Sequence, residues 1–98
     1  MTETTFLILI STFSPNHGYS IAQEITEMTD GRVKLGPGTL HGALESMESK
    51  GWIELLTPKD YFERTKKYVI TDLGREVARR EYERLAQMVE LAGKAMKE

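Results

Sequence analysis

The chain has 98 residues, of which 40% are hydrophobic and 29% are charged, and its formal net charge is -2. This composition is enough for one small globular domain with a modest core and for no more. The absence of cysteine excludes disulfides, thiol redox chemistry and cysteine-based zinc sites.

The apolar run at residues 6–10 is too short to span a bilayer, and no basic segment precedes it. It is therefore neither a signal peptide nor a membrane anchor. We expect a cytoplasmic protein without a membrane partner.

Two helices are expected first, at residues 4–13 and 19–29, separated by a turn at residues 14–18. Asp30 and Gly31 end the second helix. Residues 33–35 are predicted to form a short strand that pairs with a hairpin further along the chain. The inner stripe of the second helix is predicted to be Ile21, Ala22, Ile25 and Met28.

A third, short helix is marked at both ends. Pro37 suits a first helical position, and Gly51 suits the residue after a helix, where φ must be positive. Its apolar face is Leu40, Ala43, Leu44 and Met47. Its outer face is small and hydroxylated: Gly38, Thr39, His41, Gly42, Glu45, Ser46 and Ser49. An exposed helix followed at once by a strand is the shape of a DNA-reading helix that leads into a wing.

The wing is predicted from two β-prone runs, at residues 52–56 and 66–70, joined by a polar loop. Residues 57–69 carry four positive and two negative side chains, so the hairpin has a net charge of +2 within a net-acidic chain. Thr71 is placed to cap the following helix, and Asp72 lies favourably near its N-terminal end.

The last helix, residues 72–98, carries an apolar seam with alternating steps of four and three residues. The helix is about 40 Å long, and roughly seventy preceding residues cannot cover its whole seam. We therefore expect a two-fold homodimer. The expected interface is Phe6, Ala78, Tyr82, Leu85, Met88, Val89, Ala92 and Met96.

The order of these pieces resembles the PadR-like family of transcriptional regulators. Four motifs in register carry the resemblance: HGYSI at residues 17–21, GPGTL at 36–40, LESMESKGWI at 44–53 and KYVITDLG at 67–74. In its length, the chain resembles the short subfamily, whose members lack a separate C-terminal domain. One position departs from the family pattern, because His41 stands where the family usually has a tyrosine.

The resemblance implies a mainly α fold with a small β-hairpin (α+β), a winged helix-turn-helix at residues 1–71 and a dimerisation helix at residues 72–98. It also implies a repressor that binds a palindromic operator in double-stranded DNA, with a small planar apolar effector that releases it. The expected DNA contacts are Tyr19, Gly38, Thr39, His41, Gly42, Arg64, Lys66 and Lys67. The expected effector residues are Trp52, Tyr82 and Met88.

Each of these expectations has a simpler alternative. Tyr19 is equally well explained as the half-buried edge of the core, and exposed hydroxyls and lysines are usually only solvated. No nucleophile with a paired base, phosphate-binding glycine loop or metal cluster is present in the sequence, so neither an enzyme nor a cofactor is expected. The alternative function is a winged helix that binds another protein, which the acidic chain, Glu45 and Glu48 favour.

Overall fold

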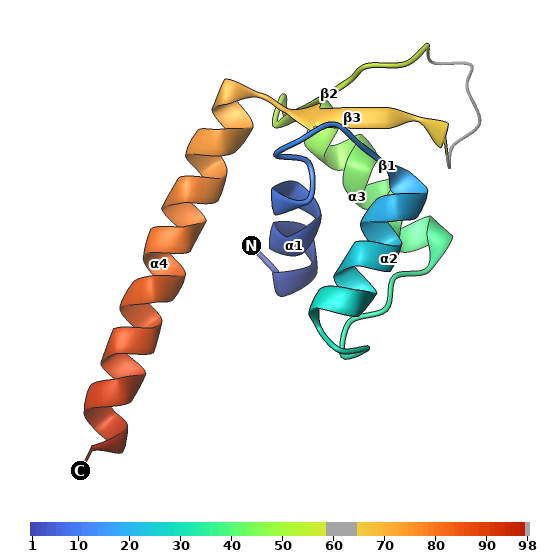
Figure 1. Cartoon of the computed structure of the whole chain (residues 1–98). Coiled ribbons are helices and arrows are strands. Elements are labelled where there is room, and N and C mark those ends of the chain that lie inside the picture. Colours follow the sequence, from blue (N-terminus) through green and yellow to red (C-terminus); the bar gives the residue numbers. More distant parts are fainter. Residues whose placement is uncertain (59–64, 98) are drawn as a thin grey trace.

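Three short helices pack around a small sheet, and one long helix extends away from them (Figure 1). The computed structural model describes residues 1–58 and 65–97. In chain order, the elements of this part are α1 (Glu3–Ile10), β1 (Asn16–His17), α2 (Gly18–Met28), α3 (Pro37–Ser49), β2 (Ile53–Leu55), β3 (Lys67–Ile70) and α4 (Asp72–Met96). The order and type of these elements confirm the predicted class, a mainly helical winged fold with a small β-hairpin.

β3 is the central strand of a three-stranded antiparallel sheet with the order β1-β3-β2. β2 and β3 form the predicted hairpin, with Ile53 opposite Ile70. β1 pairs with the other edge of β3, and His17 lies opposite Lys67. The sheet therefore ties the start of α2 to the start of β3.

The prediction of a strand at residues 33–35 is wrong, because the structure describes these residues and they form no strand. The N–H groups of Arg32 and Val33 instead donate to the carbonyl and the hydroxyl of Thr29, at 3.0 Å and 3.1 Å. These bonds hold the segment against the end of α2. The edge of β3 is occupied by β1, which lies where the sequence indicated a turn.

Two details of the first helices also differ from the prediction. α1 ends at Ile10 rather than near residue 13, and the Ser11 hydroxyl donates to the carbonyl of Leu7 at 2.8 Å. Met28 was assigned to the inner stripe of α2 but is 52% exposed. It lies in the last turn of α2 and faces a surface pocket that Ile10 also lines. Ile21 and Ile25 are fully buried, as predicted, and Ala22 packs against the core.

Both ends of α3 are where the sequence places them. Pro37 is its first residue, and Gly51 has a φ of +78°. The N–H of Gly51 donates to the carbonyl of Glu48 (3.0 Å), and the N–H of Trp52 donates to that of Met47 (2.9 Å), which is the Schellman pattern. The helix therefore ends sharply and the chain enters β2. The buried residues of its inner face are Leu40, Leu44 and Met47.

The start of α4 packs tightly on the sheet. The Thr71 hydroxyl accepts from the N–H of Gly74 at 3.0 Å and donates to the carbonyl of Trp52 at 3.0 Å, so Thr71 is the predicted cap. A Cβ atom on Gly74 would lie 2.0 Å from the Trp52 carbonyl oxygen and 2.7 Å from Cγ1 of Ile70. The absence of a side chain at Gly74 is what allows this approach.

We expect Gly74→Ala to destabilise the fold by about 2–3 kcal/mol, because overpacking against backbone costs more than the roughly 1 kcal/mol that alanine gains in a helix. The midpoint of urea unfolding measures the change. Gly42→Ala in α3 is the matched control, since its Cβ would meet nothing within 4 Å. Equal stability of Gly74→Ala and the native chain would contradict the close packing of α4.

Candidate nucleic-acid interface

The outward face of α3 is defined here as Gly38, Gly42, Glu45 and Ser49. At about 100° per residue these four positions lie opposite the buried inner face, and all four are exposed. A Cβ atom on Gly38 or Gly42 would meet nothing within 4 Å. Thr39 is exposed beside them. The first two turns of this face therefore carry little side-chain volume, and the helix backbone can lie close to another surface.

His41 and Glu45 lie side by side on the exposed side of α3. His41 Nε2 lies 2.9 Å from Glu45 Oε2, and the Glu45 side chain is 67% exposed. This contact between the two residues was not predicted from the sequence. Their spacing of four residues, which places side chains side by side on a helix, is the signal that could have joined them.

The basic residues of the hairpin that the structure describes lie at the beginning of β3. Lys66 and Lys67 are both half-buried. Lys67 is directly opposite His17, so their side chains leave the same face of the sheet. Arg64, also predicted to contact DNA, lies outside the described residues.

Tyr19 is the second residue of α2 and is exposed, which favours a surface role over a place in the core. Its hydroxyl accepts from Nε2 of Gln23 at 3.2 Å. In Figure 1 the first turns of α2 and α3 lie on the side of the molecule from which the hairpin projects. β3 begins beside the turn that carries Tyr19, because Lys67 pairs with His17, the residue before α2.

The apolar seam of α4 is largely uncovered. Tyr82, Val89 and Met96 are 65%, 73% and 83% exposed. Ala92 is exposed, and Leu85 is half-buried. At the other end of the seam, Ala78 is buried by its own chain, and Phe6 packs against the core. Of the predicted interface, Ala78 is therefore covered before any partner binds, and Phe6 is partly covered.

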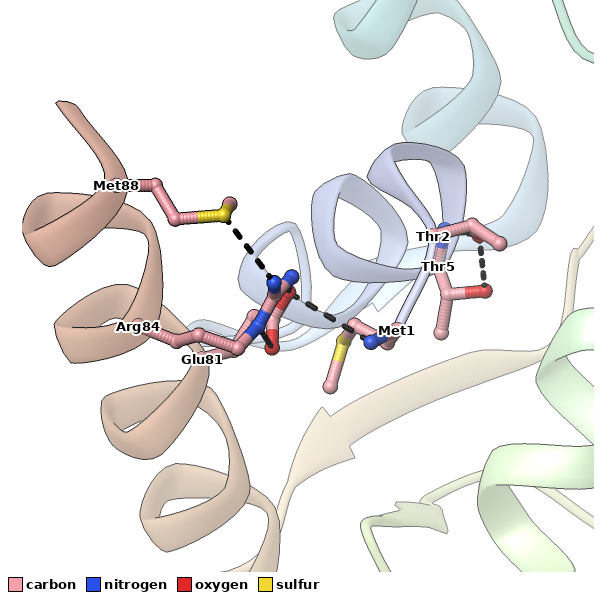
Figure 2. A network of polar contacts seen from close by, with 6 residues as sticks. All are labelled: Met1, Thr2, Thr5, Glu81, Arg84 and Met88. Atoms are coloured by element: carbon pink, nitrogen blue, oxygen red, sulfur yellow. Dashed lines mark hydrogen bonds and ion pairs between the residues drawn. The ribbon is translucent and has the colours of Figure 1, made fainter. Parts of the chain in front are cut away.

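Figure 2 shows the polar contacts between the start of α1 and the middle of α4. The Met1 amino nitrogen lies 3.7 Å from Glu81 Oε2, and Arg84 Nε donates to Glu81 Oε1 at 3.0 Å. Arg84 also points to the sulfur of Met88 (3.7 Å). The hydrogen bonds from Arg84 lower the pKa of the buried Glu81 carboxyl below its ordinary value. Glu81 was not predicted from the sequence, because its contact with the Met1 amino group joins distant parts of the chain.

The predicted effector residues are not gathered within one chain. The Trp52 carbonyl lies against Gly74, whereas Met88 is fourteen residues further along α4, or about 21 Å at the helical rise. A surface pocket of about 600 Å³ lies between α1 and α2 instead. Its lining is Ile10, Ser11, Ser14, Pro15, Asn16, Glu24, Glu27 and Met28, which includes none of Trp52, Tyr82 and Met88.

Among residues 1–58 and 65–97, no group of three or more His, Asp or Glu side chains could hold a metal ion. Within the same residues, none of the helices combines the length and the apolar character needed to cross a membrane.

Comparison with known proteins gives a family and a fold. The family model described as "Transcriptional regulator PadR-like family" matches residues 6–80. A curated protein, the "Uncharacterized 37.1 kDa protein in transposon TN4556" of Streptomyces fradiae, is 36% identical over 74 residues, or 76% of this chain. The chain spans only 20% of the length of that relative.

Solved structures agree in fold. A transcriptional regulator from Clostridium thermocellum superposes with a TM-score of 0.78 at 23% identity, covering 92% of this chain and 89% of that one. A PadR family transcription regulator from Clostridium difficile superposes with a TM-score of 0.75 at 22% identity, covering 94% and 97%.

Proposed function

Because the chain belongs to the PadR-like family of transcriptional regulators, we propose that it represses transcription by binding double-stranded DNA in the cytoplasm. The observation that carries this proposal is the exposed outward face of α3, where Gly38 and Gly42 leave the backbone bare. Thr39, His41 and this face enter the major groove. Lys66, Lys67, Arg64 and Tyr19 contact the phosphate backbone around it.

The DNA-binding form is a homodimer. Residues 1–71 form the DNA-binding unit, and the α4 seam joins two copies, since Val89 and Met96 are exposed in the single chain. A two-fold dimer presents two α3 helices to successive major grooves, which fits a palindromic operator. Binding through two linked sites supplies affinity that one short winged helix lacks.

The experiment that tests this function is recovery of host-genome fragments with the purified full chain. We expect a small set of enriched fragments that share a palindrome. The alternative, a winged helix that binds only a protein, predicts no enrichment at any salt concentration. Because phosphate contacts release counterions, true DNA binding must also weaken steeply as salt is raised.

Thr39→Ala and His41→Ala are expected to change the preference among operator variants, by about 1–3 kcal/mol for a specific base contact. The slope of affinity against salt should stay the same, because neither change removes a phosphate contact. Ser20→Ala, in the first turn of α2, serves as the control outside α3. If both variants bound the operator variants with the same order of affinities as wild type, Thr39 and His41 would have no role in base recognition.

We also propose that the dimer binds a flat, largely apolar effector between its two copies, near Tyr82 and Met88. Trp52 is included in the proposed site. Soft, uncovered methionines such as Met88 and Met96 support an apolar site of adaptable shape.

Titration with planar dyes and drugs is expected to change the fluorescence of Trp52, the single tryptophan of the chain. Met88→Ala should weaken the response, whereas Met28→Ala, on α2, should leave it unchanged. The absence of any response across a broad panel would leave the effector site without support.

A further inference from the structure

Glu45 has a central place on the outward face of α3. Its side chain is 67% exposed, and it lies one turn beyond Gly42 on the side opposite the core. Gly38 and Gly42 add no side chain that would hold the helix away from a groove. A helix that enters the major groove by this face carries the Glu45 carboxylate with it, toward the edges of the bases.

His41 limits the positions that this carboxylate can take. His41 Nε2 and Glu45 Oε2 are 2.9 Å apart, which is a hydrogen-bond distance. With its proton on Nε2, the imidazole donates to one carboxylate oxygen and leaves the other to accept from a base. The contact therefore favours side-chain positions in which one carboxylate oxygen of Glu45 stays available to the DNA.

The hydrogen-bonding groups of the bases determine which base the Glu45 carboxylate can contact. A carboxylate only accepts hydrogen bonds. In the major groove guanine presents two acceptors, thymine one acceptor and a methyl group, and adenine an acceptor beside its amine, whereas cytosine presents the N4 amine alone. The phosphates repel a carboxylate in the groove, so it is favourable only where an amine meets it.

We propose that Glu45, positioned by His41, reads a cytosine in each operator half-site. This inference rests on the proposed function, because it assigns one base to the face of α3 that enters the groove. It also gives an acidic residue of α3 a role within DNA binding, where the net-acidic character of the chain otherwise favours a protein partner.

The test is selection from a randomised double-stranded DNA library with the full chain and three variants, at one salt concentration. Wild type should enrich cytosine at one position of each half-site. Glu45→Ala should lower the preference for cytosine there by about tenfold and leave the other positions unchanged. Glu45→Gln should move the preference toward adenine, because an amide both donates and accepts.

Glu48→Ala is the matched control, since it removes the same charge from the same helix at a position off the outward face. It should keep the cytosine preference. If Glu45→Ala retained every base preference of wild type, the assignment of Glu45 would be overturned while the proposed function stood. If wild type enriched no sequence, the proposed function would fail, and this inference would fail with it.

Discussion

Leu85→Asp combined with Val89→Asp is expected to dissociate a dimer that is stable at micromolar concentration, or to unfold the chain. Val89 is 73% exposed in the single chain, and Leu85 is half-buried beside it on the α4 seam. A partner that covers this seam would bury both carboxylates without a counter-charge, which costs about 3–5 kcal/mol for each unpaired charge. The physical reason is desolvation, because the seam offers apolar atoms in place of water.

Sedimentation velocity shows whether the double variant is a dimer or a monomer. Gln87→Asp introduces the same carboxylate on the opposite side of α4, and this control should remain dimeric. Circular dichroism of the double variant distinguishes a folded monomer from an unfolded chain. A monomeric wild type would end the dimer model, and the argument for two spaced half-sites would end with it.

Lys66→Ala combined with Lys67→Ala is expected to weaken binding to all DNA sequences alike. Lys66 directly precedes β3, and Lys67 is the first residue of β3, opposite His17 and beside the start of α2. Each phosphate contact that is lost reduces the slope of log affinity against log salt by roughly 0.9. The double change removes up to about four contacts from a symmetric complex, so the loss of affinity is largest at low salt.

Binding titrations between about 50 and 200 mM salt measure both quantities. Lys94→Ala with Lys97→Ala removes the same charge from the far end of α4 and is the matched control, which should leave the salt slope unchanged. If the wing variant bound the operator as tightly as wild type with the same slope, the basic hairpin would be only solvated surface. The protein-binding alternative would then be favoured.

Local signals explain why the third helix and the hairpin could be predicted from the sequence. Pro37 and Gly51 act through their own backbone preferences, and the four-three spacing of Leu40, Leu44 and Met47 needs only the period of a helix. The Thr71 cap is equally local, since its hydroxyl bonds the N–H three residues on. The structure confirms these features. They could be predicted because they depend only on residues close to one another in the sequence.

The features that the sequence did not reveal depend on distant contacts. β1 has two residues and therefore no periodicity, and it is a strand only because β3 passes beside it. Met28 continues the apolar stripe of α2 but lies at its end, beyond the part that the core covers. Glu81 is buried because the start of α1 packs on it. The contact between His41 and Glu45 was also not predicted, although their spacing of four residues is local.

The most direct test of a two-fold dimer that reads DNA through α3 is a hydroxyl-radical footprint on a recovered genomic fragment, combined with the mass of the complex. We expect two chains on one fragment and two protected regions about one helical turn, or 10 base pairs, apart. Protection of the backbone in both regions should weaken when Thr39 and Glu45 are both changed to alanine. A single protected region bound by one chain, or protection that does not depend on α3, would contradict the account.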